Sequence, residues 1–322
     1  MKEPLLEVSN LKKYFPIKSP FLRRTVGQVK AVDGISFALN SGETLGIVGE
    51  SGCGKSTMGR MIMRVTEPTE GSILFAGQDI AAMNPSSLRK MRRDFQMVFQ
   101  DPYSSLNHKM TIHDLLAEPF RIHGILSSKS DMDAEVSRLL ETVGLRAENR
   151  FRYPHEFSGG QRQRIGIARA LALNPKLIVA DEAVSALDVS IQSQILNLMV
   201  ELRQKFNLSY IFISHNLAVV KHISDRVGVM YLGNMVEIAS KKSLFDKPLH
   251  PYTQALLSAA PQPKRSGQRE RIVLQGDVPS PANPPHGCPF HTRCPQAFAR
   301  CAAERPVLKE VGPDHQVACF LY

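Results

Sequence analysis

Residues 49–57 read GESGCGKST, and this stretch decides the fold of the chain. It matches the pattern of a phosphate-binding loop, in which a glycine is followed after four residues by Gly-Lys and then by Ser or Thr. The run before it, residues 44–48, is largely apolar and typical of a short buried strand, and residues 58–65 carry apolar side chains at helical spacing. This order of strand, loop and helix favours phosphate binding over a glycine-rich turn that binds nothing.

The residues of this loop suit the phosphates of a nucleotide. Gly49, Gly52 and Gly54 allow successive backbone N–H groups to point inward at phosphate oxygens, near the positive end of the following helix. Lys55 is expected to reach the β and γ phosphates, and Ser56 is expected to bind magnesium. The sequence therefore predicts a nucleotide site at this loop.

The length indicates one large domain and a smaller one, because 322 residues with 43% apolar side chains exceed one ordinary core. No apolar run is long enough to span a bilayer, and the chain does not open with a charged and then apolar leader. We therefore expect a soluble protein of the cytoplasm. The net charge of +10 permits attraction to nucleic acid or to an anionic membrane surface without deciding between them.

The rest of the chain reads as strands and helices. Strands are predicted at residues 5–15, 31–39, 72–75, 95–99, 177–180, 210–213 and 227–231, the last of these as the final strand of the core. Residues 111–155 read as helical, with Ser130 as the predicted cap of a helix and Asp133 three residues on. We expect this segment to be a helical subdomain inserted between two halves of the nucleotide-binding core.

Polar motifs stand where predicted strands end and helices begin. The SGGQ motif, Ser158 to Gln161, opens a helix. It is either a second phosphate-seeking structure or a plain helix start. Asp181 and Glu182 leave the end of a buried strand. There one carboxylate can hold magnesium and the other can deprotonate an attacking water, the alternative being a solvated acidic turn. His215 ends another strand and is either a γ-phosphate contact or a surface histidine.

Five elements in this order resemble the nucleotide-binding subunit of ATP-binding cassette (ABC) proteins: GESGCGKST, Gln100, SGGQ, the run ending in Asp181-Glu182 with SALD at 185–188, and His215. The resemblance covers roughly residues 5–245. It implies an α/β fold with a RecA-like core, N-terminal antiparallel strands and a helical subdomain at about residues 101–165. It also implies a head-to-tail dimer with ATP between the phosphate loop of one subunit and the SGGQ of the other.

The resemblance assigns a role to each matching residue. Phe15 would stack on adenine, and the phosphate contacts would come from Gly49, Glu50, Ser51, Gly52, Cys53, Gly54, Lys55, Ser56 and Thr57. Magnesium would be held by Ser56, Gln100 and Asp181. Glu182 would be the general base, Gln100 would sense the γ phosphate, and His215 would fix its geometry. The partner's ATP would be contacted by Ser158, Gly159, Gly160 and Gln161, and Asp188 would lie at the dimer interface.

The tail, residues 246–322, indicates which branch of the ABC proteins this chain resembles. HPYTQALLSAAP at 250–261 and GDVPSPANPPHGCPFHTRCP at 276–295 resemble the C-terminal extension of ATPases that serve dipeptide and oligopeptide importers, with nickel and glutathione importers as relatives. Residues 261–289 contain seven prolines and three glycines, which favours an extended, turn-rich arm.

Four of the five cysteines lie in this tail, at 288, 294, 301 and 319. Four thiolates can hold tetrahedral zinc or an iron–sulfur cluster, and the absence of a CxxC pair favours the bulkier group. The resemblance implies a [4Fe-4S] cluster, the alternatives being zinc and free thiols. His286 or His291 could replace one thiolate. Cys53, inside the phosphate loop, reads as a small filler.

The function implied by the resemblance is ATP hydrolysis that drives import of dipeptides or oligopeptides through a membrane. The implied partners are a second, similar ATPase subunit, in a heterodimer or a homodimer, two transmembrane permease subunits and a periplasmic or extracellular peptide-binding protein. The chain would lie peripherally on the cytoplasmic face of the cell membrane and would not bind nucleic acid. The alternatives are the same role in a nickel or glutathione importer, and a soluble ABC ATPase that acts on nucleic acid, which the net charge motivates.

Overall fold

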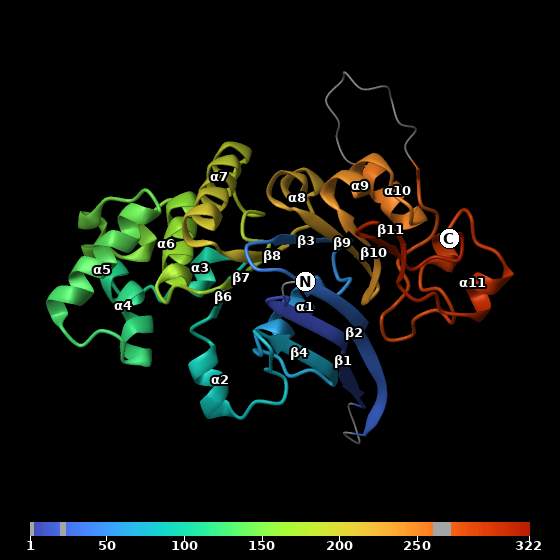
Figure 1. The fold of residues 1–322 in the computed structure, drawn as a ribbon, viewed down its shortest axis with the longest axis horizontal. Helices are drawn as coiled ribbons and strands as arrows, with labels where there is room; N and C mark the ends of the chain where they lie inside the picture. The colour runs from blue at the N-terminus through green and yellow to red at the C-terminus, as the bar shows by residue number, and fades with distance from the viewer. Residues whose placement is uncertain (1–2, 20–23, 260–271) are drawn as a thin grey trace. The chain divides into compact units, whose positions relative to one another are not determined.

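The structure is a computed structural model, and it describes residues 3–19, 24–259 and 272–322. The chain divides into two compact units (Figure 1). Unit 1 comprises Met1–Leu39, Thr44–Ala82 and Ser214–Tyr322, and unit 2 comprises Asn40–Glu43 and Met83–Ile213. The chain thus leaves unit 1 and returns to it, so unit 2 is inserted in the sequence of unit 1.

Unit 1 begins with an antiparallel sheet of four strands in the order β2-β1-β4-β5. The strands are β1 (Leu6–Lys18), β2 (Thr25–Leu39), β4 (Glu70–Phe75) and β5 (Gln78–Asp79). Leu6 and Val8 are buried while Glu7 between them is exposed, the alternation expected of a strand with one face on a core. Strands β1 and β2 run further than predicted because they continue to pair as far as Lys18 and Thr25.

The second group of strands in unit 1 follows the order β3-β9-β10-β12-β11. Strand β3 (Thr44–Val48) is parallel to β9 (Arg226–Tyr231), and β10 (Asn234–Ser240), β12 (His315–Val317) and β11 (Lys309–Gly312) extend the sheet in antiparallel fashion. The prediction that residues 227–231 form the last strand of the core is therefore wrong. Leu232 and Gly233 have positive φ, so a two-residue hairpin turn leads directly into β10.

Glu237 on β10 is a fully buried carboxylate. Its two oxygens accept hydrogen bonds from the backbone N–H groups of Leu249 and His250, at 2.8 and 2.9 Å. The ring Nε2 of His315 lies 2.7 Å from Glu237 Oε1. All three partners belong to the tail, so the tail supplies hydrogen-bond partners to a carboxylate group on β10.

The described part of unit 1 also contains helices. They are α1 (Lys55–Ile62), α8 (Leu217–Ile223), α9 (Lys241–Asp246), α10 (Pro251–Ser258) and α11 (Ala299–Ala303), with a short 3₁₀ turn, η3 (His291–Arg293). Figure 1 shows α8, α9 and α10 on the same side of β9 and β10. Residues 272–289 form no helix or strand, in line with the predicted arm. Residues 261–271 of that arm lie outside the described residues.

Unit 2 contains the parallel strands β6 (Phe95–Val98), β7 (Leu177–Asp181) and β8 (Ser209–Ile213), with β7 between the other two. Strands β7 and β8 are buried along their whole length, as expected of a parallel sheet that is covered on both faces. Helices α2 (Pro85–Met91) and α7 (Val189–Phe206) belong to the same unit.

The helical part of unit 2 lies between β6 and β7 in the sequence. It comprises α3 (Pro102–Ser105), α4 (Ile112–His123), α5 (Lys129–Thr142), the 3₁₀ turns η1 (Ala147–Phe151) and η2 (Pro154–Glu156), and α6 (Gly159–Leu171). The prediction that residues 111–155 are helical is confirmed. One detail was wrong: α5 is capped by Ser128, whose hydroxyl accepts from the Asp131 N–H at 3.4 Å, and Ser130 lies inside the helix.

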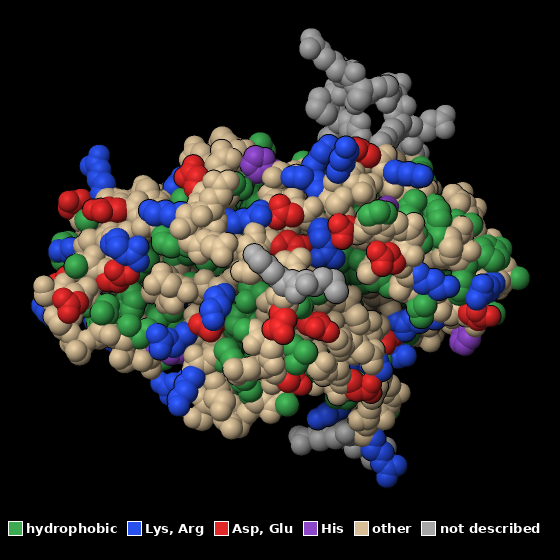
Figure 2. All heavy atoms as spheres, viewed as in Figure 1, with side chains coloured by type: hydrophobic (Ala, Val, Ile, Leu, Met, Phe, Trp, Pro, Cys, Tyr) green, Lys and Arg blue, Asp and Glu red, His purple; other side chains and the backbone are tan. Residues whose placement is uncertain are grey.

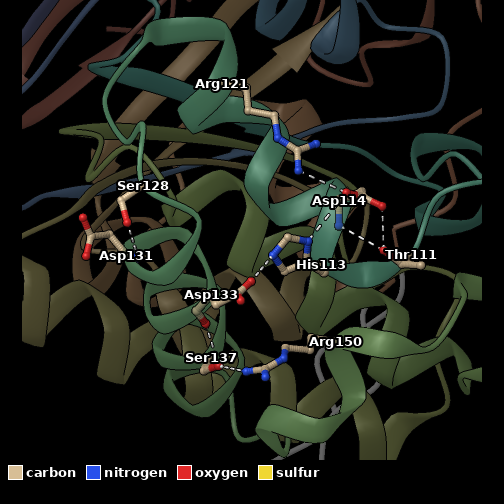
Figure 3. Close-up of polar contacts among 9 residues, drawn as sticks. All are labelled: Thr111, His113, Asp114, Arg121, Ser128, Asp131, Asp133, Ser137 and Arg150. Atoms are coloured by element: carbon tan, nitrogen blue, oxygen red, sulfur yellow. Dashed lines mark hydrogen bonds and ion pairs between the residues drawn. The ribbon is translucent and has the colours of Figure 1, made fainter.

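Polar contacts tie α4 to α5 in this region (Figure 3). His113 of α4 lies between two carboxylates, with Nε2 2.8 Å from Asp133 Oδ1 and Nδ1 3.6 Å from Asp114 Oδ1. The Asp133 contact has the distance of an ion pair without the geometry of a hydrogen bond. Arg150 of η1 donates to the Ser137 hydroxyl of α5 at 2.6 Å. These contacts hold the helices in one arrangement and touch no predicted site residue.

No helix among the described residues is long and apolar enough to cross a membrane.

Candidate functional site

The phosphate loop lies between β3 and α1 in unit 1, as predicted. Gly54 precedes α1 with φ of 101°, and a Cβ there would lie 2.1 Å from the Ala31 carbonyl oxygen. Gly49 has φ of 154°, and a Cβ there would lie 2.2 Å from the Met230 carbonyl oxygen. Both positions therefore require glycine, and the loop curls only because its sequence supplies it.

Lys55 opens α1 and is nearly fully buried, with 4% of its surface exposed. Its Nζ donates to the carbonyl oxygens of Gly49 and Glu50, both at 2.9 Å, and lies 3.8 Å from Cys53 Sγ. The ammonium thus sits at the centre of the loop, where a phosphate would need it. Burial raises the pKa of the Cys53 thiol, so this side chain is neutral, as a small filler should be.

Glu50 has contacts that the sequence analysis missed. Its backbone N–H donates to the Tyr252 hydroxyl at 2.9 Å, and its carboxylate Oε2 accepts from Arg293 Nη1 at 3.1 Å. These partners are 202 and 243 residues away in the sequence. In the sequence, the stretch around Tyr252 only resembles a C-terminal extension, and no local pattern indicates either contact.

In unit 2 the structure brings Gln100 and Glu182 together. Gln100 follows β6, Glu182 follows β7, and β6 and β7 are adjacent parallel strands, so both residues leave the same edge of the sheet. Gln100 Nε2 donates to Glu182 Oε2 at 3.0 Å. Asp181, the last residue of β7, is buried with 3% of its surface exposed.

Glu182 has a left-handed backbone, with φ of 47°. This conformation costs free energy in a non-glycine residue, and it persists only where the surrounding contacts impose it. Here the Glu182 N–H donates to the Ile213 carbonyl at 3.0 Å, and the Glu182 carbonyl accepts from the Ser185 hydroxyl at 2.9 Å. The chain therefore turns sharply after β7 and directs the carboxylate toward Gln100.

The SGGQ residues form a complete capping box at the start of α6. The Ser158 hydroxyl accepts from the Gln161 N–H at 3.3 Å, and Gln161 Oε1 accepts from the Ser158 N–H at 3.0 Å. Both side chains are exposed, and Gly160 is buried. Asp188 is the exposed N-cap residue that precedes α7, and its side chain makes no capping bond there. The motif thus has a structural role in its own subunit and an exposed face.

His215 and Phe15 belong to unit 1. His215 is exposed and lies two residues beyond the end of β8. Phe15 on β1 is 41% exposed, and Lys13 Nζ lies 5.1 Å from the centre of its ring. An exposed aromatic face of this kind is able to stack on a base, and it does not pack in the core.

Four cysteines of the tail line one small pocket, together with His250, Phe290 and His291. Burial raises the pKa of the Cys288 thiol to about 11 and raises those of Cys294 and Cys319, and neighbouring thiols raise each further. In the described part of the chain, no group of three or more His, Cys, Asp or Glu side chains has the geometry to hold a metal ion. His286 is not among the lining residues.

Comparison with known proteins shows the family to which the chain belongs. The model of the ABC transporter family matches residues 32–185, and the model of the oligopeptide/dipeptide transporter C-terminal region matches residues 236–301. The chain is 60% identical to the oligopeptide transport ATP-binding protein AppF of Bacillus subtilis over 324 residues, which cover all of this chain and 98% of AppF. The chain belongs to the ABC transporter family. Its members of this type are ATPases that use ATP with magnesium, and the predicted fold class is confirmed.

Other ABC transporter proteins are similar in sequence or structure. The putative oligopeptide transport ATP-binding protein YkfD of Bacillus subtilis is 53% identical over 99% of this chain and 96% of its own length. The dimeric ATP-binding cassette MJ0796, in a post-hydrolysis state with ADP and Pi, superposes with a TM-score of 0.66 at 26% identity, over 73% of this chain and 98% of that one. The cassette CbiO1 of Clostridium perfringens gives 0.65 at 26% identity, over 76% and 92%.

Proposed function

We propose that this ABC transporter ATPase drives import of dipeptides or oligopeptides. The observation that carries the proposal is the C-terminal region, residues 236–301, which matches the oligopeptide/dipeptide transporter model. Relatives that are named for oligopeptide transport cover the whole chain, tail included. Residues 1–245 form the nucleotide-binding domain, with a helical subdomain at about 101–165, and residues 246–322 form the extension.

The roles of the site residues follow the family pattern. Phe15 stacks on adenine, and Lys55 and Thr57 bind phosphates. Ser56, Gln100 and Asp181 hold magnesium, and their hydroxyl, amide and carboxylate oxygens are the ligands that this ion prefers. When bound, magnesium neutralises charge on the phosphates. Glu182 accepts the proton of the attacking water, and its bond to Gln100, at 3.0 Å, orients the carboxylate for this task.

The ATPase acts as a head-to-tail dimer, with a similar subunit or with a second copy of itself. Ser158, Gly159, Gly160 and Gln161 contact the partner's ATP, Asp188 lies at the interface and His215 fixes the γ phosphate. Exposure of Ser158 and Gln161 supports this role, and so does the dimeric state of MJ0796. Closure on ATP and reopening after hydrolysis move two permease subunits, which receive the peptide from a binding protein outside the membrane. The ATPase lies on the cytoplasmic face.

The charges on the face drawn in Figure 2 give no support to nucleic-acid binding. Figure 2 shows basic and acidic side chains interspersed on the face that it draws. Among the described residues of this face, the net charge of +10 does not gather into one basic stripe, which a nucleic-acid groove would need.

An iron–sulfur cluster in the cysteine-lined pocket is part of this proposal, and what supports it is the donor set, because the described thiols are not arranged with metal-holding geometry. Four thiols line one small pocket, together with His250, Pro251, Phe290 and Phe320. A [4Fe-4S] cluster takes four thiolates, and it would supply a rigid crosslink between Cys288, Cys294, Cys301 and Cys319. Anaerobic purification of the full chain should give about four irons and four sulfides per chain. Stoichiometric zinc, or neither metal, would contradict the cluster. Cys288→Ser should lose the iron, and Cys53→Ser is the matched control.

The transport test uses the full chain purified with the membrane proteins that accompany it, in vesicles that contain ATP. We expect uptake of a labelled tripeptide that requires ATP and is abolished by Lys55→Ala. Uptake of nickel or glutathione in place of the peptide would support the importer role but would contradict a dipeptide or oligopeptide substrate. Stable association with DNA or ribosomes, and with no membrane protein, would contradict the importer itself.

A further inference from the structure

The HPYT stretch, residues 250–253, is built into unit 1 behind the phosphate loop. His250 caps α10, and its Nδ1 accepts from the Tyr252 N–H at 3.1 Å. The His250 N–H donates to the buried Glu237 carboxylate at 2.9 Å. These bonds fix the direction in which Tyr252 leaves the helix.

Tyr252 belongs to an aromatic cluster, which we define as Tyr231, His250, Tyr252 and Phe290. Ring centres in the cluster lie 4.7 Å apart for Tyr231 and Tyr252, and 5.4 Å apart for Tyr252 and Phe290. The four side chains have at most 1% of their surface exposed, so the rings cannot reorient freely. The Tyr252 hydroxyl therefore has a fixed position, where it accepts the Glu50 N–H at 2.9 Å.

Arg293 reaches Glu50 from another part of the tail. Its side chain is 9% exposed, and Nη1 donates to the Glu50 carboxylate at 3.1 Å and to the Tyr231 hydroxyl at 3.5 Å. The guanidinium also lies over the Tyr231 ring, 6.0 Å from its centre. The aromatic cluster thus holds Arg293 as well as Tyr252, and both act on one residue of the phosphate loop.

Glu50 poses a problem for a phosphate loop, because its carboxylate follows Gly49 directly. A negative charge at this place repels the triphosphate of ATP, and the repulsion is strong where the surroundings are partly dry. The Glu50 side chain is 31% exposed, so solvent screens it only in part. The Arg293 cation cancels this charge, and Tyr252 holds the backbone at the same residue.

We propose that Tyr252 and Arg293 are positioning residues of the ATP site, through which the C-terminal extension holds Glu50, fixes the phosphate loop and neutralises the charge that would repel ATP. The extension then contributes to nucleotide affinity without touching the nucleotide. This role is separate from peptide transport and from the contents of the cysteine-lined pocket. It uses the ATP site that membership of the ABC transporter family establishes.

The test is a double-mutant cycle in the full chain, read by the Kd for a fluorescent ATP analogue and by KM and kcat of ATP hydrolysis. Arg293→Met should raise Kd and KM about tenfold and change kcat by less than about twofold, because the loop is intact but repels phosphate. Arg293→Lys should recover most of the affinity. In a Glu50→Gln background, Arg293→Met should have no further effect on Kd, because the charge that it neutralises is gone.

Two further variants keep the test decisive. Tyr252→Phe retains the ring and removes only the acceptor of the Glu50 N–H, so a rise in Kd of about threefold or more is expected even where Arg293→Met does not fold. Arg300→Met is the matched control, because Arg300 also lies in the tail and pairs with Glu304 at 2.9 Å. An unchanged Kd in both Arg293→Met and Tyr252→Phe overturns the proposal. An equal loss for Arg293→Met with and without Glu50→Gln assigns Arg293 to the fold of the tail, and it also overturns the proposal.

Discussion

At the scale of single residues, the ATP site is assembled from short-range and long-range contacts. Lys55 and its carbonyl partners lie within six residues of each other, in the loop that the sequence predicted to bind phosphates. The pairing of Gln100 with Glu182 crosses 82 residues, and it arises because both residues end neighbouring parallel strands, an adjacency that the sequence analysis did not predict. Tyr252 and Arg293 had no such guide, because no local pattern reports that a tail folds back onto a loop.

The first prediction concerns Glu182. Glu182→Gln preserves the shape and the Gln100 side of the contact but removes the proton acceptor, so we expect kcat to fall by about 10²–10⁴ with ATP binding retained. Phosphate release in a single turnover measures the first effect, and an ATP-dependent increase in mass on size exclusion reports the trapped dimer. Glu201→Gln on α7 is an exposed control. Wild-type turnover in Glu182→Gln would contradict the assigned base.

At the scale of elements, hydrophobic periodicity located most helices and strands, and local hydrogen bonding set their ends. The apolar stripe of α5 predicted the helix, but the predicted cap was Ser130, whereas Ser128 caps the helix. The choice depends on which residue takes up an extended backbone, and Ser128 does, with ψ of 133°. Strand β10 was missed because the Leu232-Gly233 turn carries only one glycine as its signal.

The second prediction tests that cap. Ser128→Ala removes the acceptor for the Asp131 N–H and should destabilise unit 2 by about 1 kcal/mol. Ser130→Ala, two residues on in the same exposed turn, should change stability by less than about 0.5 kcal/mol. Urea unfolding of the two variants beside the wild type measures the difference. If Ser130→Ala proved the more damaging variant, the helix would begin where the sequence first indicated.

At the scale of the whole molecule, the tail is joined to the N-terminal sheet of unit 1 as well as to the phosphate loop. Arg305 donates to Asp33 Oδ2 and to the Asp33 carbonyl, both at 2.7 Å, and the Tyr14 hydroxyl donates to the same carboxylate. Composition predicted that the tail is a separate segment. The contacts 272 residues apart in the sequence could not be predicted from it, because Asp33 and Arg305 each read as ordinary surface charges.

The third prediction follows from the pKa of Asp33. Burial works against its charge, but hydrogen bonds from Tyr14 and Arg305 outweigh burial, and the pKa of Asp33 is lowered. A lowered pKa in the folded state stabilises the fold above the ordinary aspartate value, about 3.9, and this contribution is lost as the pH falls through the folded-state pKa. Asp33→Asn should therefore be destabilised by about 1–3 kcal/mol at pH 7.

The difference between Asp33→Asn and the wild type should be constant from pH 7 to pH 5 and should shrink only below about pH 4. Urea midpoints across this range measure it, with Glu304→Gln as a control because Glu304 pairs on an exposed surface. A gap that closes already between pH 7 and pH 5 would show that another group is responsible.

The buried Glu237 carboxylate has a consequence for how such proteins can be recombined. Among the described residues, the hydrogen-bond and ion-pair partners of the Glu237 side chain, Leu249, His250 and His315, all come after residue 245. Severing the chain there would remove all three together with β12, the strand that pairs with β10, and would leave β10 as an open sheet edge. A truncated chain should therefore be less stable than the full one, and a chimera that exchanges tails between related ATPases should keep an acid at the position of Glu237 together with groups in the new tail that bond to it.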